Sequence, residues 1–121
     1  MNPKLWEIWN LNQLAARTSG KIPIQPNDPK ELERRYLIIA DPKKRSTSTC
    51  CPIQEFVGKR LILQTEVFLP KNYGKFITKD CVIVCHEIYT LDNYYFTNNL
   101  GKLQTVEINS VCDALFEFLN I

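Results

Sequence analysis

The apolar residues of this chain fall into short runs separated by turn signals, and only the C-terminal tail has the spacing of a helix face. The runs lie at residues 4–12, 34–40, 50–56, 60–69 and 81–92. From Thr105 onward, apolar residues recur at helical spacing: Ile108, Val111, Cys112, Leu115, Phe116 and Leu119. Helices do not alternate with the expected strands, which argues against a parallel sheet. The pattern predicts a mainly β (α+β) fold, a small antiparallel barrel with a C-terminal amphipathic helix.

The first run predicts a strand, and the second predicts a strand with a defined end. In residues 4–12 the alternation puts Trp6 and Ile8 on one face, with Leu5, Glu7 and Trp9 on the other. The second strand is expected to end at Ala40, because Asp41 precedes Pro42 and proline has no backbone donor.

The remaining segments predict loops and strands of different kinds. Residues 13–33 should form an inserted loop with a short helix capped by Asp28, and residues 43–49 a solvated connection. Pro52 favours an edge strand or a bulge in its run. Residues 60–69 suit a long strand, buried over half its length and wetter toward Gln64 and Glu66. The aromatic segment 92–102 is expected to be a loop.

Length and composition indicate one globular domain over residues 1–121. The chain has 45% hydrophobic and 23% charged residues, close to the average for globular proteins. Its formal net charge of +2 is too small to argue for nucleic-acid binding by bulk attraction. A signal peptide and a membrane span are not expected, because no long uninterrupted apolar stretch is present. We therefore expect a cytoplasmic protein that does not associate with membranes.

Five cysteines and one histidine do not form a usual zinc pattern, since there is no CxxC. Cysteines within apolar runs are expected to be buried free thiols. The signatures GxGxxG, GxSxG and HExxH and the P-loop are also missing from the sequence. Cys85 and His86 are poorly placed for a nucleophile pair, because adjacent strand residues point to opposite faces. No cofactor or metal is expected.

Polar residues at the ends of the expected strands form a set suited to a phosphodiester. Metal-free RNA cleavage needs a base, an acid and donors for charge on the phosphoryl oxygens. Charged strand ends are, however, most often only solvated. The set consists of Arg34, Arg35, Lys43, Lys44, Arg45, Thr49, Gln54, His86, Glu87, Tyr89 and Asp92.

The order of the segments resembles the MazF/PemK family of toxin endoribonucleases, over most of the chain outside residues 13–33. "LWEIW", "RRYLIIAD", "STCCPIQE", "KDCVIVCHEIYTLDN" and "LGKLQ" follow one another as the family's "rGdIw", "RPvlvvs", "vvaPiTs", "dsvvlcdQirtiDk" and "iGkLs" do. The resemblance implies an SH3-like barrel with a terminal helix and a homodimer. It also implies metal-independent cleavage of single-stranded RNA at short sequences, and a cognate antitoxin peptide that covers the RNA groove.

The resemblance carries over to individual residues. Arg35 matches an arginine that stabilises phosphate charge, and Asp92 matches the family's aspartate. Gln54 stands where the family has a catalytic Thr or Ser, Glu87 replaces a Gln and Tyr89 replaces an Arg. Two further positions differ: Tyr36 stands for a proline and Trp6 for a glycine.

Two functions follow from this comparison. The first is a type II toxin that cleaves RNA, with Arg35, Gln54, Asp92, Glu87 and His86 as catalytic candidates. Its RNA-binding candidates are Arg34, Lys43, Lys44, Arg45, Thr49 and Tyr89. The second is a MazF-fold protein that has lost cleavage and binds RNA or a protein, as the changes at Gln54 and Tyr89 would allow. The loop Tyr94 to Phe96 either stacks bases or covers the core.

Overall fold

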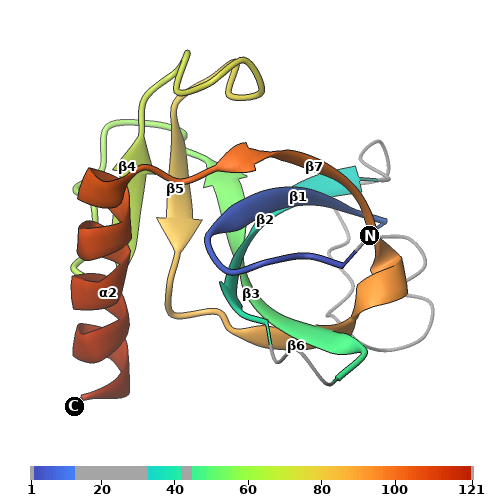
Figure 1. Cartoon of the computed structure of the whole chain (residues 1–121). Coiled ribbons are helices and arrows are strands. Elements are labelled where there is room, and N and C mark those ends of the chain that lie inside the picture. Colours follow the sequence, from blue (N-terminus) through green and yellow to red (C-terminus); the bar gives the residue numbers. More distant parts are fainter. Residues whose placement is uncertain (1, 13–32, 42–44, 121) are drawn as a thin grey trace.

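The computed structural model describes residues 2–12, 33–41 and 45–120, apart from the side chains of Glu33 and Arg34. Within these ranges the chain forms seven strands, a single 3-10 turn and one α-helix (Figure 1). They are β1 (Glu7–Asn12), β2 (Glu33–Ala40), β3 (Thr47–Glu55), β4 (Glu66–Leu69), β5 (Cys81–Val84), β6 (Tyr89–Asp92), η1 (Asn93–Tyr95), β7 (Phe96–Lys102) and α2 (Thr105–Leu119). The helix expected after Asp28 lies outside the described residues.

All pairings among these strands are antiparallel, as predicted. The strand order is β4-β5-β3-β2-β1-β7, and β6 pairs with β3 beside this path. The two ends of the path, β4 and β7, are not paired with each other in the described part of the chain. The barrel is therefore curled but open, with β1, β2, β3, β6 and β7 surrounding a common interior (Figure 1).

β3 is the central strand, which corrects two expectations. It already begins at Thr47, within the segment expected to be a solvated connection, and it pairs with β2, β5 and β6. The expectation that Pro52 marks an edge strand is therefore wrong. Pro52 pairs with Tyr36 of β2 on one edge of β3, but on the other edge it lies between two ladders, because β6 pairs as far as Cys50 and β5 begins at Ile53. A proline that lacks its donor fits this gap.

The run at residues 60–69 is the largest departure from expectation. Only Glu66–Leu69 form a strand, and Glu66 is buried, whereas Leu61 is 87% exposed. Gln64 is exposed as expected, whereas Glu66 is buried and the apolar residues from Leu61 to Leu63 are exposed. Arg60 explains the difference, because its guanidinium binds both carboxylate oxygens of Glu66 at 2.7 and 2.8 Å. This ion pair anchors Glu66 at the start of β4 and leaves the apolar residues before it in solvent.

Two further expectations are corrected near the ends of the chain. β1 begins at Glu7, and Trp6 lies in the preceding turn with a φ of 67°. The segment expected to be an aromatic loop contains β7 after η1. In this segment Tyr95 and Phe96 are buried in a hydrophobic cluster, which agrees with the expectation that these aromatic residues cover the core, whereas Tyr94 is exposed.

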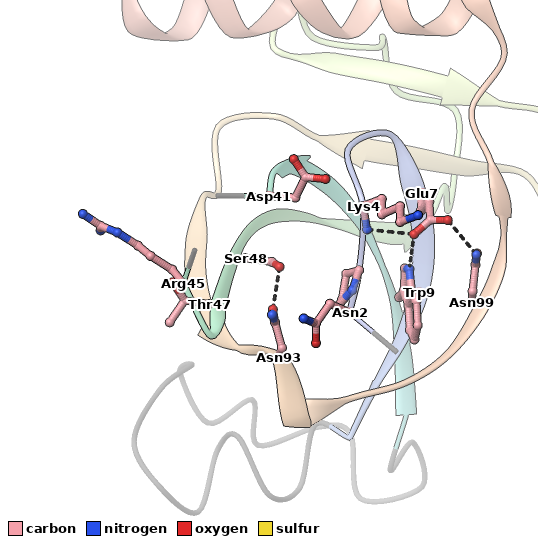
Figure 2. A pocket seen from close by; sticks show the side chains of 11 residues that line it. Asn2, Lys4, Glu7, Trp9, Asp41, Arg45, Thr47, Ser48, Asn93 and Asn99 are labelled. Atoms are coloured by element: carbon pink, nitrogen blue, oxygen red, sulfur yellow. Dashed lines mark hydrogen bonds between the residues drawn. The ribbon is translucent and has the colours of Figure 1, made fainter. Parts of the chain in front are cut away.

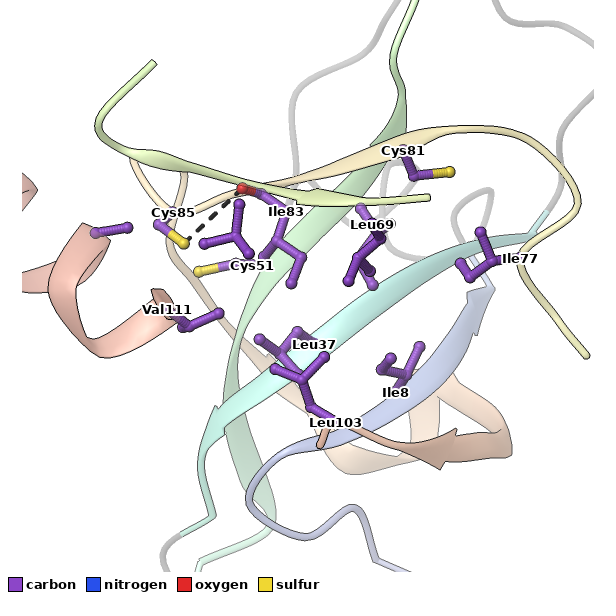
Figure 3. Packing of buried hydrophobic residues seen from close by; sticks show 13 residues of the cluster. Ile8, Leu37, Cys51, Leu69, Ile77, Cys81, Ile83, Cys85, Leu103 and Val111 are labelled. Atoms are coloured by element: carbon purple, nitrogen blue, oxygen red, sulfur yellow. Dashed lines mark hydrogen bonds between the residues drawn. The ribbon is translucent and has the colours of Figure 1, made fainter. Parts of the chain in front are cut away.

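Two clusters of buried side chains hold the molecule together, one on each side of the sheet. Core 1 lies between the sheet and α2 and contains Ile8, Leu37, Cys51, Ile53, Val67, Leu69, Ile77, Cys81, Ile83, Cys85, Leu103, Val111 and Ala114 (Figure 3). Core 2 fills the curled part of the sheet with Trp9, Leu11, Tyr36, Ile38, Cys50, Leu91, Tyr95 and Phe96. Successive side chains of β2 point to opposite faces, so Tyr36 and Ile38 pack in core 2 and Leu37 packs in core 1.

The predicted C-terminal helix is confirmed as α2, but its packed face differs from the expected one. Val111 and Ala114 are buried, and Ile108 and Leu115 pack against core 1. Phe116 and Leu119, expected on the buried face, are about half exposed.

No helix in the described ranges is long and apolar enough to cross a membrane. All five cysteines are free thiols, four of them buried and Cys112 partly exposed.

Candidate active site

A polar cluster lies where β3 changes partner from β6 to β5. The run expected at residues 81–92 is divided into two strands: β5 ends at Val84, Cys85 and His86 form a turn, and β6 begins at Tyr89. Both strands pair with the same edge of β3, one after the other. The connection between them therefore crosses the gap at Pro52 and brings Glu87 to the side chain of Gln54.

Glu87 is the centre of this cluster. Its Oε2 accepts a hydrogen bond from the Gln54 amide at 3.3 Å, and its Oε1 accepts one from the Tyr89 hydroxyl at 3.0 Å. All three side chains are partly buried. Each carboxylate oxygen has two lone pairs, so each still has room for a further donor.

Tyr89 links the cluster to core 2. Its ring meets Tyr36 edge to face, with ring centroids 6.5 Å apart and an interplanar angle of 74°. Burial raises the pKa of Tyr89 above its ordinary value, and the hydrogen bond to Glu87 raises it further. At neutral pH Tyr89 is therefore a protonated donor.

The arrangement offers the groups that acid–base chemistry on a phosphodiester requires. A carboxylate can accept a proton, a protonated hydroxyl can donate one, and an amide N–H can hydrogen-bond to a phosphoryl oxygen. The Gln54 bond is the longer of the two contacts to Glu87, so this is the partner that an incoming ligand exchanges most readily.

Arg35 lies on the other face of the sheet. β2 pairs with β3 through Tyr36 and Pro52, so the register places Arg35 opposite Ile53, on the side of core 1. Its Nη1 donates to the carbonyl oxygen of Phe76 at 2.7 Å. The structure therefore brings Gln54, Glu87 and Tyr89 together and gives Arg35 a separate position.

His86 and Asp92 also lie apart from Gln54. The Nδ1 of His86 is 2.8 Å from the Thr65 hydroxyl, and its ring meets Phe118 of α2 at 6.4 Å between centroids. Asp92 pairs with Thr47, seven residues before Gln54 on β3, which is roughly 23 Å along an extended strand. Their catalytic roles stay predictions.

The RNA-binding candidates are spread over the surface. Thr49 and Thr90 join their hydroxyls at 2.9 Å across β3 and β6. Arg45 is exposed just before β3. The backbone of Arg34 pairs with Leu11, whereas its side chain and the whole of Lys43 and Lys44 lie outside what the structure describes.

Tyr36 is the member of this site that the sequence did not nominate. It appeared only as a departure from the family's proline, and its contact with Tyr89 depends on the pairing of distant strands.

Among the residues that the structure describes, no group of three or more His, Cys, Asp or Glu side chains could hold a metal ion.

Comparisons with known proteins show the family of the chain and relatives of its fold. Residues 21–119 match the family described as "PemK-like, MazF-like toxin of type II toxin-antitoxin system". No curated protein sequence matches the chain.

Several solved structures share the fold. A MazE-MazF complex from Deinococcus radiodurans has a TM-score of 0.70 at 15% identity, covering 100% of this chain and 98% of that one. An endoribonuclease in complex with its cognate antitoxin, from a mycobacterial species, has a TM-score of 0.68 at 12% identity, covering 98% and 96%. The Mycobacterium tuberculosis toxin MazF-mt6 has a TM-score of 0.63 at 20% identity, covering 74% and 88%.

Proposed function

The chain belongs to the PemK-like, MazF-like toxins of type II toxin-antitoxin systems, and we propose that it cleaves single-stranded RNA without a metal ion. The observation that carries this proposal is the hydrogen-bonded cluster of Gln54, Glu87 and Tyr89. Gln54 stands where the family has its catalytic Thr or Ser, and the neighbouring carboxylate supplies the acid–base group that an amide lacks.

In the proposed reaction the ribose 2′-oxygen attacks the adjacent phosphorus, and the bond from phosphorus to the 5′-oxygen breaks. Glu87 accepts the proton of the 2′-hydroxyl, and Tyr89 donates a proton to the departing 5′-oxygen. The Gln54 amide turns from Glu87 to a phosphoryl oxygen, where negative charge grows. The products are a 2′,3′-cyclic phosphate and a 5′-hydroxyl end.

Arg35 is the proposed source of positive charge for the phosphate. Its hydrogen bond to the Phe76 carbonyl uses one of five guanidinium N–H donors, so the others are available to a phosphate. Because Arg35 lies on the face opposite Gln54, this role requires the RNA to pass around the edge formed by the start of β2. Arg34, Lys43, Lys44, Arg45 and Thr49 remain proposed RNA contacts.

The proposed partners are a cognate antitoxin peptide and a second copy of the chain. The D. radiodurans MazE-MazF structure is a complex, and the mycobacterial endoribonuclease structure is a complex with a cognate antitoxin. Both support an antitoxin as the partner of this chain. Large apolar side chains exposed on α2 and before β4 support burial against a partner, among them Leu61, Leu63, Phe116 and Leu119. We also propose a cytoplasmic location, where both RNA and antitoxin are present.

The test is incubation of the purified protein with a long single-stranded RNA in EDTA. Cuts that persist in EDTA and leave 5′-hydroxyl and cyclic-phosphate ends are expected. The Arg35→Ala protein should cut far more slowly, and Lys79→Ala, which removes a charge from an exposed ion pair with Glu55, should cut at the normal rate. RNA left intact by well-folded protein at high concentration would contradict the proposal.

A further inference from the structure

Two buried thiols lie in contact in core 1, beside the candidate active site. Cys51 on β3 and Cys85 in the turn after β5 are both fully buried, and a hydrogen bond joins their side chains. Figure 3 shows the two sulfur atoms next to each other in core 1. Neither thiol has a role in the proposed cleavage reaction.

The strand register explains why the two thiols meet. The ladder of β3 and β5 pairs Ile53 with Ile83. The same register, continued by two residues, places Cys51 opposite Cys85. At the other end of the ladder, the N–H of Phe56 donates to the carbonyl directly opposite at 2.8 Å, so Phe56 belongs to a hydrogen-bonded pair. Because the two kinds of pair alternate, Cys51 and Cys85 occupy a non-hydrogen-bonded position, where facing side chains are closest.

The turn that carries Cys85 lies where this ladder breaks. Pro52 has no N–H to donate to the Val84 carbonyl opposite it. That carbonyl accepts instead from the Glu87 N–H within the turn, at 3.3 Å, and the Cys85 N–H donates to the Thr65 carbonyl at 2.9 Å. Local opening of a turn at the end of a ladder admits a small molecule to a thiol that is buried in the closed state.

β3 is the fixed partner of this pair. Its start is tied to η1, because the buried Ser48 hydroxyl donates to Asn93 Oδ1 at 2.6 Å (Figure 2). On the edge away from the turn, Cys51 pairs with Leu37 of β2. A force between the two sulfur atoms therefore moves the turn at Cys85 toward β3.

The two thiols differ in how readily they ionise. The hydrogen bond from Cys51 lowers the pKa of Cys85, although burial acts in the opposite direction. The same hydrogen bond raises the pKa of Cys51, and burial raises it further. Since the thiolate is the reactive form of cysteine, Cys85 is the thiol that reacts first.

We propose that Cys51 and Cys85 form a redox pair that hydrogen peroxide closes into a disulfide bond. The Cys85 thiolate attacks a peroxide oxygen, the O–O bond breaks, and Cys85 becomes a sulfenic acid. The departing hydroxide takes up the proton that Cys85 released. The Cys51 sulfur then attacks the Cys85 sulfur, the S–O bond breaks, and the hydroxide leaves as water with the proton of Cys51. Two thiols are oxidised, and the peroxide is reduced to two molecules of water.

The disulfide regulates the candidate active site, a consequence that rests on the proposed function. Cys51 lies three residues before Gln54, and Cys85 lies two residues before Glu87. A covalent bond brings the sulfur atoms closer by more than about 1 Å than a non-bonded contact does, and draws the turn toward β3. A misplacement of this size costs up to about 10²-fold in rate, so the oxidised protein is expected to cleave RNA at least about tenfold more slowly.

The first test is peroxide treatment of the full chain, followed by alkylation of the remaining thiols and mass spectrometry of the tryptic peptides. In the double variant Cys50→Ala, Cys81→Ala, each of the two peptides concerned keeps one thiol, so a linked pair of peptides identifies the bond. We expect a link between Cys51 and Cys85 that dithiothreitol reverses. The oxidised protein should also unfold at higher urea concentration, because the link restricts the unfolded chain.

The second test is RNA cleavage after the peroxide has been removed with catalase. The unaltered protein is expected to lose activity about tenfold or more and to regain it with dithiothreitol. Cys51→Ala should cleave at the same rate before and after treatment. Cys81→Ala is the matched control, since Cys81 is also a buried thiol of core 1, and it should respond to peroxide as the unaltered protein does.

Separate outcomes would overturn the two parts of this inference. Alkylation of both thiols after peroxide treatment and unfolding, or sulfinic acid at Cys85 without a link, would overturn the redox pair. This measurement needs only the unaltered chain, so it decides even if Cys51→Ala does not fold. A linked protein that cleaves RNA at the unaltered rate would overturn the regulation. Untreated protein that leaves RNA intact would contradict the proposed function, whereas the peptide link would still decide the redox pair.

Discussion

Trp6 holds a backbone conformation that residues with side chains rarely adopt. Its φ is 67°, and its backbone is fixed on both sides, by a bond from its N–H to the Ile38 carbonyl and by one to its carbonyl from the Leu103 N–H. The family pattern has glycine here, which adopts this conformation without strain. Trp6 costs about 1–2 kcal/mol in backbone strain, which its ring offsets by packing against core 1. The turn is therefore retained although the residue has changed.

Glu66 provides a prediction for stability as a function of pH. The hydrogen bonds from Arg60 hold the pKa of Glu66 below its ordinary value, although burial acts in the opposite direction. A carboxyl group whose pKa is lower in the folded state stabilises the fold above its unfolded pKa, near 4.3. This contribution is lost as the pH falls through the folded pKa.

We therefore expect Glu66→Gln to unfold at lower urea concentration than the unaltered protein at pH 7. The difference in unfolding free energy should persist to about pH 5 and shrink below about pH 4, as Glu66 becomes neutral in both states. Urea titrations at four pH values check this. A difference that does not change between pH 7 and pH 3 would contradict the role given to this ion pair.

At the scale of elements, the strongest local signals predicted the structure best. β2 ends at Ala40, before the Asp41-Pro42 pair, and α2 follows the apolar spacing that begins at Thr105. β7 was missed because most of its side chains are polar and exposed, so that its pairing with β1 depends on the backbone. The apolar residues before β4 were expected to be buried but are exposed, because an ion pair within the same run, between Arg60 and Glu66, fixes the start of the strand.

The candidate site was predictable in its residues and less so in its geometry. Gln54, Glu87 and Tyr89 were all nominated from sequence, and the structure places them in contact. The separate position of Arg35 could not be read from the sequence, because the face of a strand residue depends on a register fixed by long-range pairing.

Two valines on α2 test the packing of this helix against core 1. Val111 is fully buried and Val106 is 71% exposed. Val111→Ala should lower the free energy of unfolding by roughly 2 kcal/mol, because buried methyl groups are lost and a cavity remains. Val106→Ala should change it little or raise it slightly, since alanine favours helices. Chemical denaturation of both proteins measures the difference, and equal effects would show that α2 does not pack as described.

At the scale of the whole molecule, an apolar stripe on α2 suggests how two copies associate. Phe116 and Leu119 are 52% and 51% exposed, and their spacing of three residues places them side by side on the helix. Burial of such a stripe would stabilise a homodimer, in line with the family resemblance.

Light scattering after size exclusion should therefore give about twice the 14.1 kDa mass of one chain at tens of micromolar protein. The double variant Phe116→Ser, Leu119→Ser should elute as a monomer, because its stripe is polar. Tyr94→Ser is the control, since Tyr94 is also exposed and belongs to η1, which directly follows β6, and β6 lies away from α2 (Figure 1). A monomeric mass for the unaltered chain would exclude this dimer.

The molecule as a whole is proposed to act through the cluster of Gln54, Glu87 and Tyr89, and one substitution tests this most directly. Glu87→Gln keeps the size of the side chain and removes the base, so the single-turnover rate of RNA cleavage should fall about 10²- to 10⁴-fold with the fold unchanged. Glu55→Gln, an exposed carboxylate beside Gln54 on β3, is the matched control and should retain the normal rate. Cleavage by the Glu87→Gln protein at the unaltered rate would contradict the account.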